Sequence, residues 1–308
     1  MKKKDFALVV FLGFIALAVF ANFFRFWFDQ TKANYQPIST RSRKTGHFPA
    51  PPSATPTLTP PTPTLTLTPR QLVEARKKQF VELNQKYGPC HYVPVLLYHH
   101  VMDAKDAKEI GASYLNVPPE VFRAQMDYLL QKGYQIIGLE EMVKGLENSS
   151  LPTKPVVLTF DDGYLDFYDY VYPILREKNL KATLFIISQF VGGERYLVWA
   201  QIQEMVKSGL VLPGNHTLNH PYLTKLTDFQ IKDQIFSANN ILREYLGRSV
   251  YFFAYPYGGF NAQTEQALKE GGFQGAVVTT NQAPQCLRLP YRFSRIRVGA
   301  ASLAHYGL

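Results

Sequence analysis

The chain has 308 residues, of which 46% are hydrophobic and 19% are charged, and its formal net charge is +9. This length suits one large domain with appended segments. Residues 1–70 hold nine Lys and Arg against two Asp and Glu, so +7 of the net charge lies there and only +2 lies in the remainder. The basic character therefore belongs to the N-terminal part, and we expect no nucleic-acid partner.

The N-terminal segment predicts a membrane anchor. Three lysines precede residues 6–24, a run that is apolar apart from Asn22. At helical rise this run just spans the bilayer core, and the basic flank places the N-terminus in the cytoplasm. A cleaved signal peptide is the alternative, because Ala16-Leu17-Ala18 resembles a cleavage site. We favour an uncleaved single-pass anchor over residues 1–28, because the run continues into aromatic residues typical of the membrane interface.

Residues 29–69 are predicted to be a linker. Within it, residues 48–69 are mostly Pro, Thr and Ala without charge, which is typical of a semi-extended spacer. A polar helix follows, with Thr68 as its N-cap, Pro69 at its first position and Gly88 at its end. We assign residues 70–90 to this linking helix and residues 91–308 to the main domain.

Predicted strands and helices alternate from residue 93 onward. The strands are 93–98, 135–138, 156–160, 183–188, 211–213, 251–254 and 275–279. The helices are 119–132, 139–146, 166–178 with a break near Pro173, 199–208, one after the capping box 227–230, and one capped by Asn261. This alternation predicts a parallel sheet, open or closed into a barrel, with the ligand site at the carboxyl ends of the strands. No Gly-rich phosphate loop follows any of these strands, which argues against nucleotide binding.

The chain has two cysteines, Cys90 and Cys286. An extracytoplasmic location permits a disulfide between them, which would tie the beginning of the domain to its end. Two separate buried thiols are the alternative.

Two adjacent carboxylates, Asp161 and Asp162, stand directly after the apolar strand 156–160. Acids at the end of a buried strand are costly to desolvate, so a cation or a catalytic role should compensate them. Neighbouring residues at a strand end point in different directions, so one carboxylate can bind a metal while the other faces a substrate. A simple Asp-Asp-Gly turn is the alternative.

Two histidines, His216 and His220, follow the short strand 211–213. Four residues apart, they share one face if the turn is helical, and they can then chelate one metal ion. With Asp162 they form a His-His-Asp set that suits zinc and leaves positions open for water.

These two stretches resemble a known family. Thr159-Phe160-Asp161-Asp162-Gly163 and His216-Thr-Leu-Asn-His220 are similar to the first two motifs of the polysaccharide deacetylases, carbohydrate esterase family 4. The resemblance covers roughly residues 93–300 and implies a distorted (β/α)7-type barrel. It also implies that Asp161 is the catalytic base and that Asp162, His216 and His220 hold a divalent metal, with zinc the expected ion.

The segment 253–258 resembles the third motif of the family, in which a tyrosine backbone amide stabilises the oxyanion; the matching residue is Tyr257. The family arginine that pairs with the base is replaced here by Ala254. Arg295 or Arg297 is a candidate substitute from another strand.

The late histidine that serves the family as general acid has no clear counterpart, since His305 has no strand before it. The strand 93–98, however, leads into His99 and His100. This resembles the branch that deacetylates poly-N-acetylglucosamine, in which the motif order is circularly shifted. We expect His99 to be the general acid, with His100 as the second choice.

Together these patterns predict a membrane-anchored, extracytoplasmic, metal-dependent hydrolase. We expect it to act as a monomer and to remove N-acetyl groups from a polysaccharide that contains N-acetylglucosamine. An O-acetyl esterase and an inactive carbohydrate-binding barrel are the alternatives, and a secreted protein is the alternative to an anchored one.

Overall fold

The structure is a computed structural model that describes residues 69–308. Its helices are α2 (Pro69–Tyr87), α3 (Ala104–Glu109), α4 (Pro119–Gln131), α5 (Leu139–Asn148), α6 (Tyr172–Lys178), α7 (Trp199–Lys207), α8 (Asp228–Leu246) and α9 (Ala262–Glu270). Its strands are β1 (Cys90–Tyr92), β2 (Val95–Tyr98), β3 (Gln135–Ile137), β4 (Pro155–Phe160), β5 (Ala182–Ile186), β6 (Val211–Asn215), β7 (Phe252–Ala254), β8 (Gly275–Val278), β9 (Pro284–Cys286), β10 (Phe293–Ser294) and β11 (Ile296–Arg297). The N-terminal anchor and the linker predicted above lie outside the described residues. None of the helices within residues 69–308 has the length and apolar character needed to span a bilayer.

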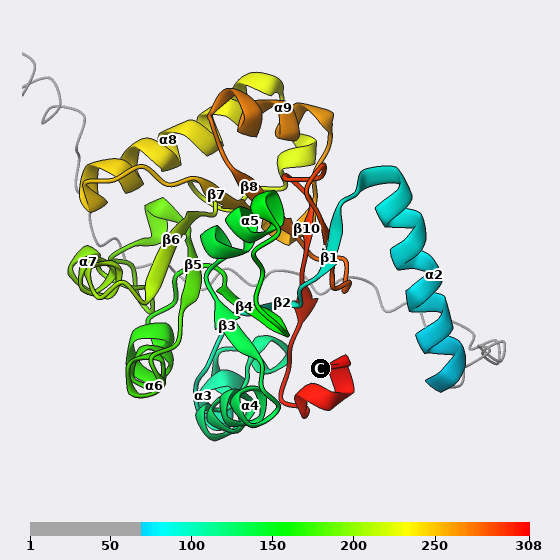
Figure 1. Cartoon of the computed structure of the whole chain (residues 1–308). Helices are drawn as coiled ribbons and strands as arrows, with labels where there is room; N and C mark the ends of the chain where they lie inside the picture. The colour runs from blue at the N-terminus through cyan, green and yellow to red at the C-terminus, as the bar shows by residue number, and fades with distance from the viewer. Residues whose placement is uncertain (1–68) are drawn as a thin grey trace, which may run out of the picture. The chain divides into compact units, whose positions relative to one another are not determined.

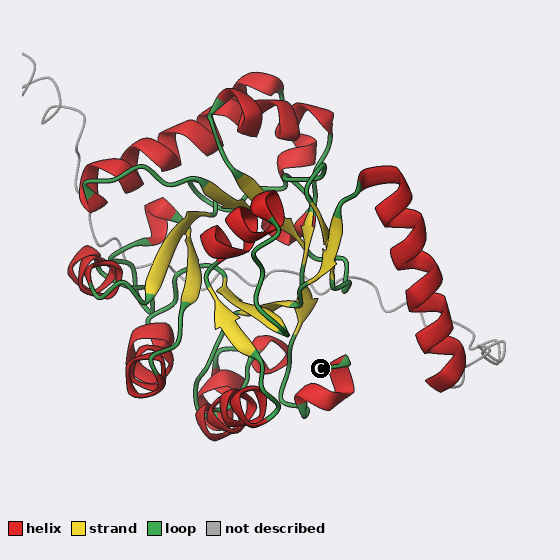
Figure 2. Ribbon diagram, viewed as in Figure 1, coloured by secondary structure: helices red, strands yellow, loops and turns green. Residues whose placement is uncertain are grey.

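The parallel strands form a nearly closed barrel with helices around its outside (Figures 1 and 2). The order of the strands is β10-β8-β7-β6-β5-β4-β2-β11, and β3 pairs with β4 off this path. The predicted α/β class and parallel sheet are thereby confirmed, and of the open and closed forms that the alternation allowed, the nearly closed barrel is the one present. All carboxyl ends of the parallel strands meet at one end of the barrel, where residues that follow the strands can converge.

One extended segment, residues 293–297, closes the barrel. Its first half, β10, pairs in parallel with β8, and its second half, β11, pairs in parallel with β2. Arg295 lies between the two halves and is only 1% exposed. The sequence prediction ended at the strand that is now β8 and therefore missed this closing segment as a strand pair, because its halves have two residues each.

The strands of the barrel bury both faces. In β4 every residue is buried, with Val156 and Leu158 packed against the outer helices and Val157 in a separate inner cluster. That inner cluster includes the apolar face of α5, which lies across the strands in Figure 1. Helix α5 thus covers the apolar end of the interior, while Thr159 and Asp161 make the other end polar.

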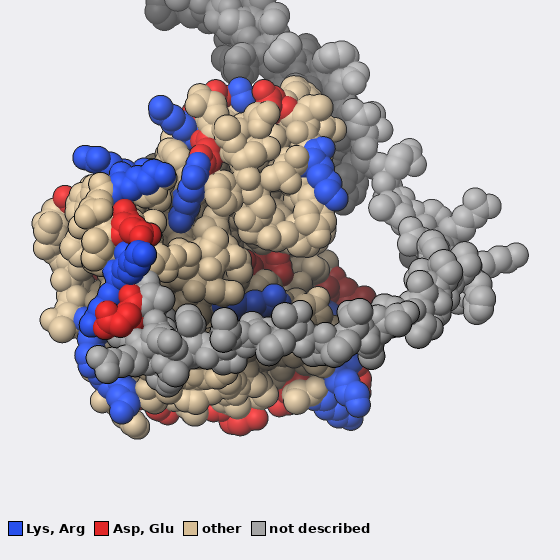
Figure 3. All heavy atoms as spheres, turned by 90° about the vertical axis from the view of Figure 1, so that its right-hand side faces the viewer, with Lys and Arg blue, Asp and Glu red and all other residues tan. Residues whose placement is uncertain are grey.

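The predicted helix signals also hold. Thr227 accepts a hydrogen bond from the backbone N–H of Gln230 at the start of α8, and Asn261 accepts one from Thr264 at the start of α9. The break expected near Pro173 takes the form of a π-helical turn, residues 167–171, ahead of α6. Charges on the face shown in Figure 3 are interspersed in sign over the described surface.

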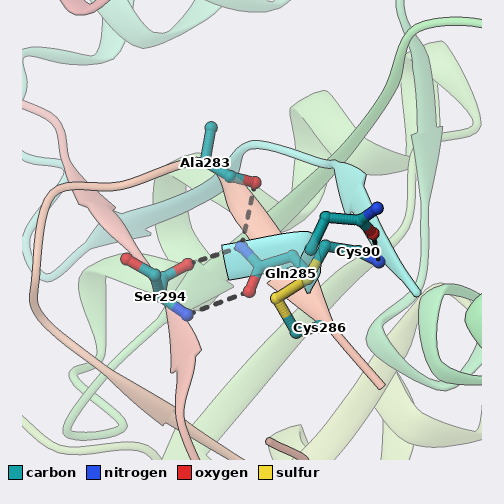
Figure 4. Close-up of a disulfide and its surroundings, with 6 residues drawn as sticks. Cys90, Ala283, Gln285, Cys286 and Ser294 are labelled. Atoms are coloured by element: carbon teal, nitrogen blue, oxygen red, sulfur yellow. Dashed lines mark hydrogen bonds between the residues drawn. A yellow bond between two sulfur atoms is a disulfide. The ribbon is translucent and has the colours of Figure 1, made fainter. Parts of the chain in front are cut away.

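A disulfide between Cys90 and Cys286 joins β1 to β9, so this alternative for the two cysteines is the correct one. The two strands form an antiparallel ribbon in which the cysteines face each other (Figure 4). Next to it, the buried Gln285 side chain donates to the carbonyl oxygens of Val93 and Ser294 and accepts from the Ser294 N–H. The β1–β9 ribbon thus fixes the position of Ser294, the residue that precedes Arg295.

Replacing both cysteines with alanine should lower the free energy of unfolding by about 2–5 kcal/mol. The disulfide closes a loop of sequence separation 196, so its loss releases a large part of the unfolded chain from constraint. Denaturant unfolding of the double variant and the parent, both without reductant, measures the change. An unchanged unfolding midpoint would contradict this expectation.

Candidate active site

The carboxyl end of β4 carries two carboxylates whose side chains take different directions. Asp161 continues the strand and is buried against Arg295. Asp162 turns away with a φ of +74° and approaches the two histidines. Positive φ is unfavourable for a residue with a Cβ, so the turn holds strain at this position. The two carboxylates therefore point in different directions, as expected for neighbouring residues at a strand end.

Arg295 forms a two-pronged ion pair with Asp161. Nη1 donates to Oδ1 and Nη2 donates to Oδ2, both at 2.7 Å, and Nη1 also lies 3.3 Å from Thr159 Oγ1. Burial by itself raises the pKa of Asp161, but the adjacent Arg295 guanidinium and His216 outweigh it and lower that pKa. Of the two arginines considered from the sequence, Arg295 pairs with the carboxylate, while Arg297 lies over the ring of Tyr114.

Asp162, His216 and His220 bring one ligand atom each within 4.8 Å of one another. Asp162 Oδ1 lies 3.3 Å from His216 Nε2 and 3.5 Å from His220 Nε2. Among the described residues this buried oxygen has no hydrogen-bond partner. An unpaired carboxylate oxygen that faces two imidazole nitrogens fits a divalent cation, and this mixed donor set suits zinc.

The protonation preferences of two of these side chains agree with this fit. Burial lowers the pKa of His220 to about 4, which favours the neutral imidazole that a metal ligand requires. Burial raises the pKa of Asp162, but the adjacent His216 side chain reverses this and keeps that pKa well below its usual range. Asp162 is thus a carboxylate over the working pH range.

The turn that carries the two histidines is not helical, contrary to the condition set in the sequence analysis. After β6 the chain makes an irregular turn in which Thr217 and His220 have φ values of +70° and +62°. Asn215 Oδ1 accepts from the Thr217 N–H, and Thr217 Oγ1 accepts from the His220 N–H. These local bonds replace helical ones and still bring the imidazoles together, with ring centroids 4.8 Å apart.

Ala254, which stands where the family has an arginine, contributes to the site through its backbone carbonyl. His216 Nδ1 donates to the carbonyl oxygen of Ala254 at 2.8 Å. Because a carbonyl only accepts, this bond fixes the hydrogen on Nδ1 and leaves Nε2 free as a metal ligand.

His99 and His100 take different places. His99 is half-buried and lines a cavity of about 400 Å³ together with Asp161, His216, His220 and Arg295; we call it the site cavity. His100 lies outside that lining, where its Nδ1 is 2.6 Å from Asp166 Oδ2. Burial lowers the pKa of His99, against the attraction of the nearby carboxylates.

Tyr257 also lines the site cavity, at its rim. It has a φ of +59° and is 57% exposed. Its ring stacks on Tyr222 with centroids 3.8 Å apart and meets His220 edge to face at 4.6 Å. Four residues of this site without the freedom of glycine, Asp162, Thr217, His220 and Tyr257, thus have left-handed backbones, and such clustering is typical of functional sites.

Sequence reasoning missed two residues that support the site. Asp166 fixes His100, and it also accepts from the Val101 N–H at 3.0 Å. Tyr164 stacks on His100 with centroids 3.8 Å apart and lines the site cavity. Both stand just after Asp161-Asp162, but a Tyr and an Asp at the start of a predicted helix carry no sign of such contacts.

Comparisons with known proteins agree with this geometry. Residues 148–276 match the family model for polysaccharide deacetylase. The chain is 30% identical over 207 residues to YxkH of Bacillus subtilis, named as a polysaccharide deacetylase, covering 67% of this chain and 71% of that protein. It is 26% identical over 196 residues to the poly-beta-1,6-N-acetyl-D-glucosamine N-deacetylase of Staphylococcus epidermidis, covering 59% and 68%.

Two solved structures are similar to this one. The Streptococcus pyogenes deacetylase PplD in complex with acetate has a TM-score of 0.60 and 31% identity, over 67% of this chain and 92% of that one. IcaB from Ammonifex degensii has a TM-score of 0.61 and 29% identity, over 67% and 91%. Shared fold, shared sequence and the matching family model place the chain in the polysaccharide deacetylase family.

Proposed function

We propose that the protein is a metal-dependent deacetylase that removes N-acetyl groups from a polymer of N-acetylglucosamine. The observation that carries this is the single cavity lined by the Asp161–Arg295 pair, the Asp162, His216 and His220 set, and His99. The N-deacetylase named for Staphylococcus epidermidis supports the choice of sugar.

Asp162, His216 and His220 hold the metal in this proposal. A zinc ion held there would supply Lewis-acid chemistry: it would polarise an acetyl carbonyl and lower the pKa of water. Asp161 accepts the proton of the attacking water, and Arg295 keeps its carboxylate charged and oriented. The Tyr257 N–H donates to the oxygen on which negative charge develops. His99 gives a proton to the leaving nitrogen, so the amide and water become acetate and an amine.

An acetate-release assay on acetylated glycans tests this function. The purified full-length chain should release acetate from poly-N-acetylglucosamine, and a chelator should abolish the release until zinc is restored. Release only from O-acetylated glycans would favour the esterase alternative. Binding of glycan without release from any of them would favour the inactive barrel.

Replacing His99 with alanine should lower N-deacetylation roughly 10²- to 10⁴-fold, the range lost with a general acid. The leaving amine must gain a proton as the C–N bond breaks, whereas the better leaving group of an aryl acetate needs this less. Hydrolysis of an activated aryl acetate should therefore change little. The metal content should also change little, since His99 is not one of the proposed ligands.

His100→Ala is the neighbouring comparison for that experiment. If His99→Ala keeps full activity on the polysaccharide and His100→Ala does not, the assignment is off by one residue. If neither variant loses activity, the interpretation that a histidine after the strand 93–98 acts as the general acid is wrong.

We also propose that residues 1–28 anchor the protein, with the barrel outside the cytoplasm. The apolar run with its basic flank supports this, and the Cys90–Cys286 disulfide suits an oxidising compartment. The mature protein should keep residues 1–24 and stay with membranes through a salt wash. Mass-spectrometric detection of a new N-terminus near Val19 would instead identify a cleaved signal peptide.

A further inference from the structure

The Asp161–Arg295 pair depends on the backbone from which the arginine side chain extends. Arg295 is 1% exposed, and both of its Nη atoms bond Asp161. Beyond that carboxylate, the guanidinium has one longer contact, with Thr159 Oγ1 at 3.3 Å, and it lies over the ring of Phe185. Its buried Nε has no hydrogen-bond partner among the described residues. Few contacts therefore orient the guanidinium itself, so its position follows from that of the Arg295 backbone.

The peptide unit between Ser294 and Arg295 is held at both of its ends. Its N–H, on Arg295, donates to the carbonyl oxygen of Val278 at 3.0 Å and continues the pairing of β10 with β8. Its carbonyl oxygen, on Ser294, accepts from Gln285 Nε2 at 2.8 Å. The tilt of this peptide unit sets the direction in which the Arg295 side chain leaves the backbone. One of the two bonds that fix this tilt thus comes from the Gln285 side chain.

Gln285 bonds Ser294 as a neighbouring strand would. Its Oε1 also accepts from the Ser294 N–H at 3.0 Å, so one amide bonds both backbone groups of that residue (Figure 4). The same Nε2 donates to the carbonyl oxygen of Val93, just before β2, at 3.0 Å. Strands β10 and β11 have two residues each, so the backbone pairing around Ser294 is short. The Gln285 amide adds bonds that a longer strand would make, at the place where the barrel closes.

The Ser294 hydroxyl is held separately, by the Thr280 hydroxyl and the Gln282 N–H. These bonds act on a side chain that can rotate about its Cα–Cβ bond, so they leave the neighbouring peptide units free to tilt. Gln285 is therefore the side chain that acts directly on the peptide unit leading to Arg295.

The β1–β9 ribbon keeps Gln285 in place. Gln285 is 1% exposed, and the next residue, Cys286, forms the disulfide with Cys90. Two residues before Gln285, the Ala283 carbonyl oxygen accepts from the Val93 N–H at 3.0 Å. A side-chain amide can donate to carbonyl oxygens and accept from an N–H at once, whereas an ionised carboxylate cannot donate and an apolar side chain can do neither. The residue type and its rigid support thus both suit a positioning role.

We infer that Gln285 is a positioning residue for the proposed reaction. It fixes the peptide unit before Arg295, so that the guanidinium holds the Asp161 carboxylate in the place where it accepts the proton of the attacking water. This inference rests on the proposed function. Gln285 does not line the site cavity, so it acts on the reaction only through Arg295.

Gln285→Met tests the inference in the full-length, zinc-loaded protein. Methionine has nearly the same length but no amide, so both backbone groups of Ser294 lose a partner. The kcat for N-deacetylation of poly-N-acetylglucosamine should fall roughly tenfold with KM within roughly twofold, because a misplaced base weakens the transition state and not substrate binding. Hydrolysis of an activated aryl acetate should fall by the same factor, since both substrates need Asp161. The metal content should not change.

Gln125→Met is the matched control. Gln125 is also buried, and its amide donates to the carbonyl oxygens of Gly299 and Ala301 and accepts from the Tyr98 hydroxyl. Both substitutions remove a buried amide that has two carbonyl oxygens within 3.0 Å, so both should lower the unfolding temperature. Gln125 lies outside the site cavity, and Gln125→Met should keep the wild-type kcat.

A double-mutant cycle separates positioning from a general loss of structure. The aryl acetate rate is measured for wild type, Gln285→Met, Asp161→Asn and the double variant, well below the unfolding temperature of each. A residue that acts through Arg295 on Asp161 should lower the rate of the Asp161→Asn protein by less than roughly twofold, because the group that it positions is already gone. A crystal structure of Gln285→Met should show the Arg295 guanidinium displaced from residue 161.

A wild-type kcat in Gln285→Met would overturn the inference. So would an equal loss of kcat in Gln125→Met, the full loss on top of Asp161→Asn, or an unchanged Arg295–Asp161 contact in the crystal structure. If Gln285→Met does not fold, Gln285→Asn, which keeps the amide on a shorter side chain, replaces it; if neither folds, Gln285 serves the fold and not the rate, and the inference is wrong. If wild type releases acetate from no N-acetylated glycan, the proposed function fails, while the aryl acetate cycle and the crystal structure still decide whether Gln285 positions Arg295.

Discussion

Replacing His216 or His220 with alanine is expected to remove the bound metal and nearly all turnover. Each substitution deletes one of the two imidazoles that converge on Asp162 Oδ1, and the two ligands that remain cannot hold a divalent ion firmly. Elemental analysis of the purified variants measures the metal content, and acetate release measures turnover.

His305→Ala is the matched control, because His305 is exposed and lies outside the site cavity. It should keep the metal and the full rate. An undiminished metal load in both His216→Ala and His220→Ala would contradict the ligand assignment.

Asp161→Asn is expected to keep the metal and lose the rate. Asparagine fills the same space but cannot accept the proton of the attacking water, and a general base contributes about 10²- to 10⁴-fold. The substitution also leaves the guanidinium of Arg295 buried without a full counter-charge, and breaking such a pair costs about 3–5 kcal/mol. Thermal unfolding of the variant should therefore be measured together with its rate, and the activity assays should be run well below its unfolding temperature.

Asp106→Asn, an exposed carboxylate on α3, is the control for Asp161→Asn and should leave both rate and stability unchanged. If Asp161→Asn retains the full rate on the polysaccharide, another group accepts the proton. If it loses the metal as well, Asp161 is part of the metal site rather than its neighbour.

The regular part of the fold was accessible from the sequence because local signals agree with the tertiary structure there. The apolar run ending at Phe160 is a strand buried on both faces, and the capping residues Thr227 and Asn261 begin helices as expected. In such segments the hydrophobic pattern, the caps and the turn residues all indicate the same structure.

The closing segment could not be predicted in the same way. Its strands, β10 and β11, are too short to show a period, and β11 pairs with β2, which lies at the other end of the domain in sequence. Arg295 as the partner of Asp161 was therefore only one of two candidates. Choosing between Arg295 and Arg297 requires knowing which one lies where the two halves of the segment meet.

The candidate site likewise has features that the sequence indicates and features that only the tertiary structure determines. The residue types in the two motifs indicated a metal site, because acids at the end of a buried strand need a compensating charge and paired histidines can chelate a metal ion. The role of Asp161 as the base came from the resemblance to the family. The backbone that presents them was not predictable, because left-handed residues such as Thr217 and His220 depend on bonds to Asn215 and on tertiary packing. A helical turn was the default assumption, and it was wrong.

The position of Arg295 also has a consequence for how the protein reaches its active form. Strands β2 and β4 to β8 leave the ribosome before residues 293–297, so during synthesis the sheet has open edges at β2 and β8. Throughout that time Asp161 lacks its partner, and burying its charge is unfavourable. Closure needs contacts across almost the whole domain, which slows folding. The nascent chain is thus expected to need protection from edge-to-edge association, and the Asp161 carboxylate gains its arginine partner only after residues 293–297 have been made.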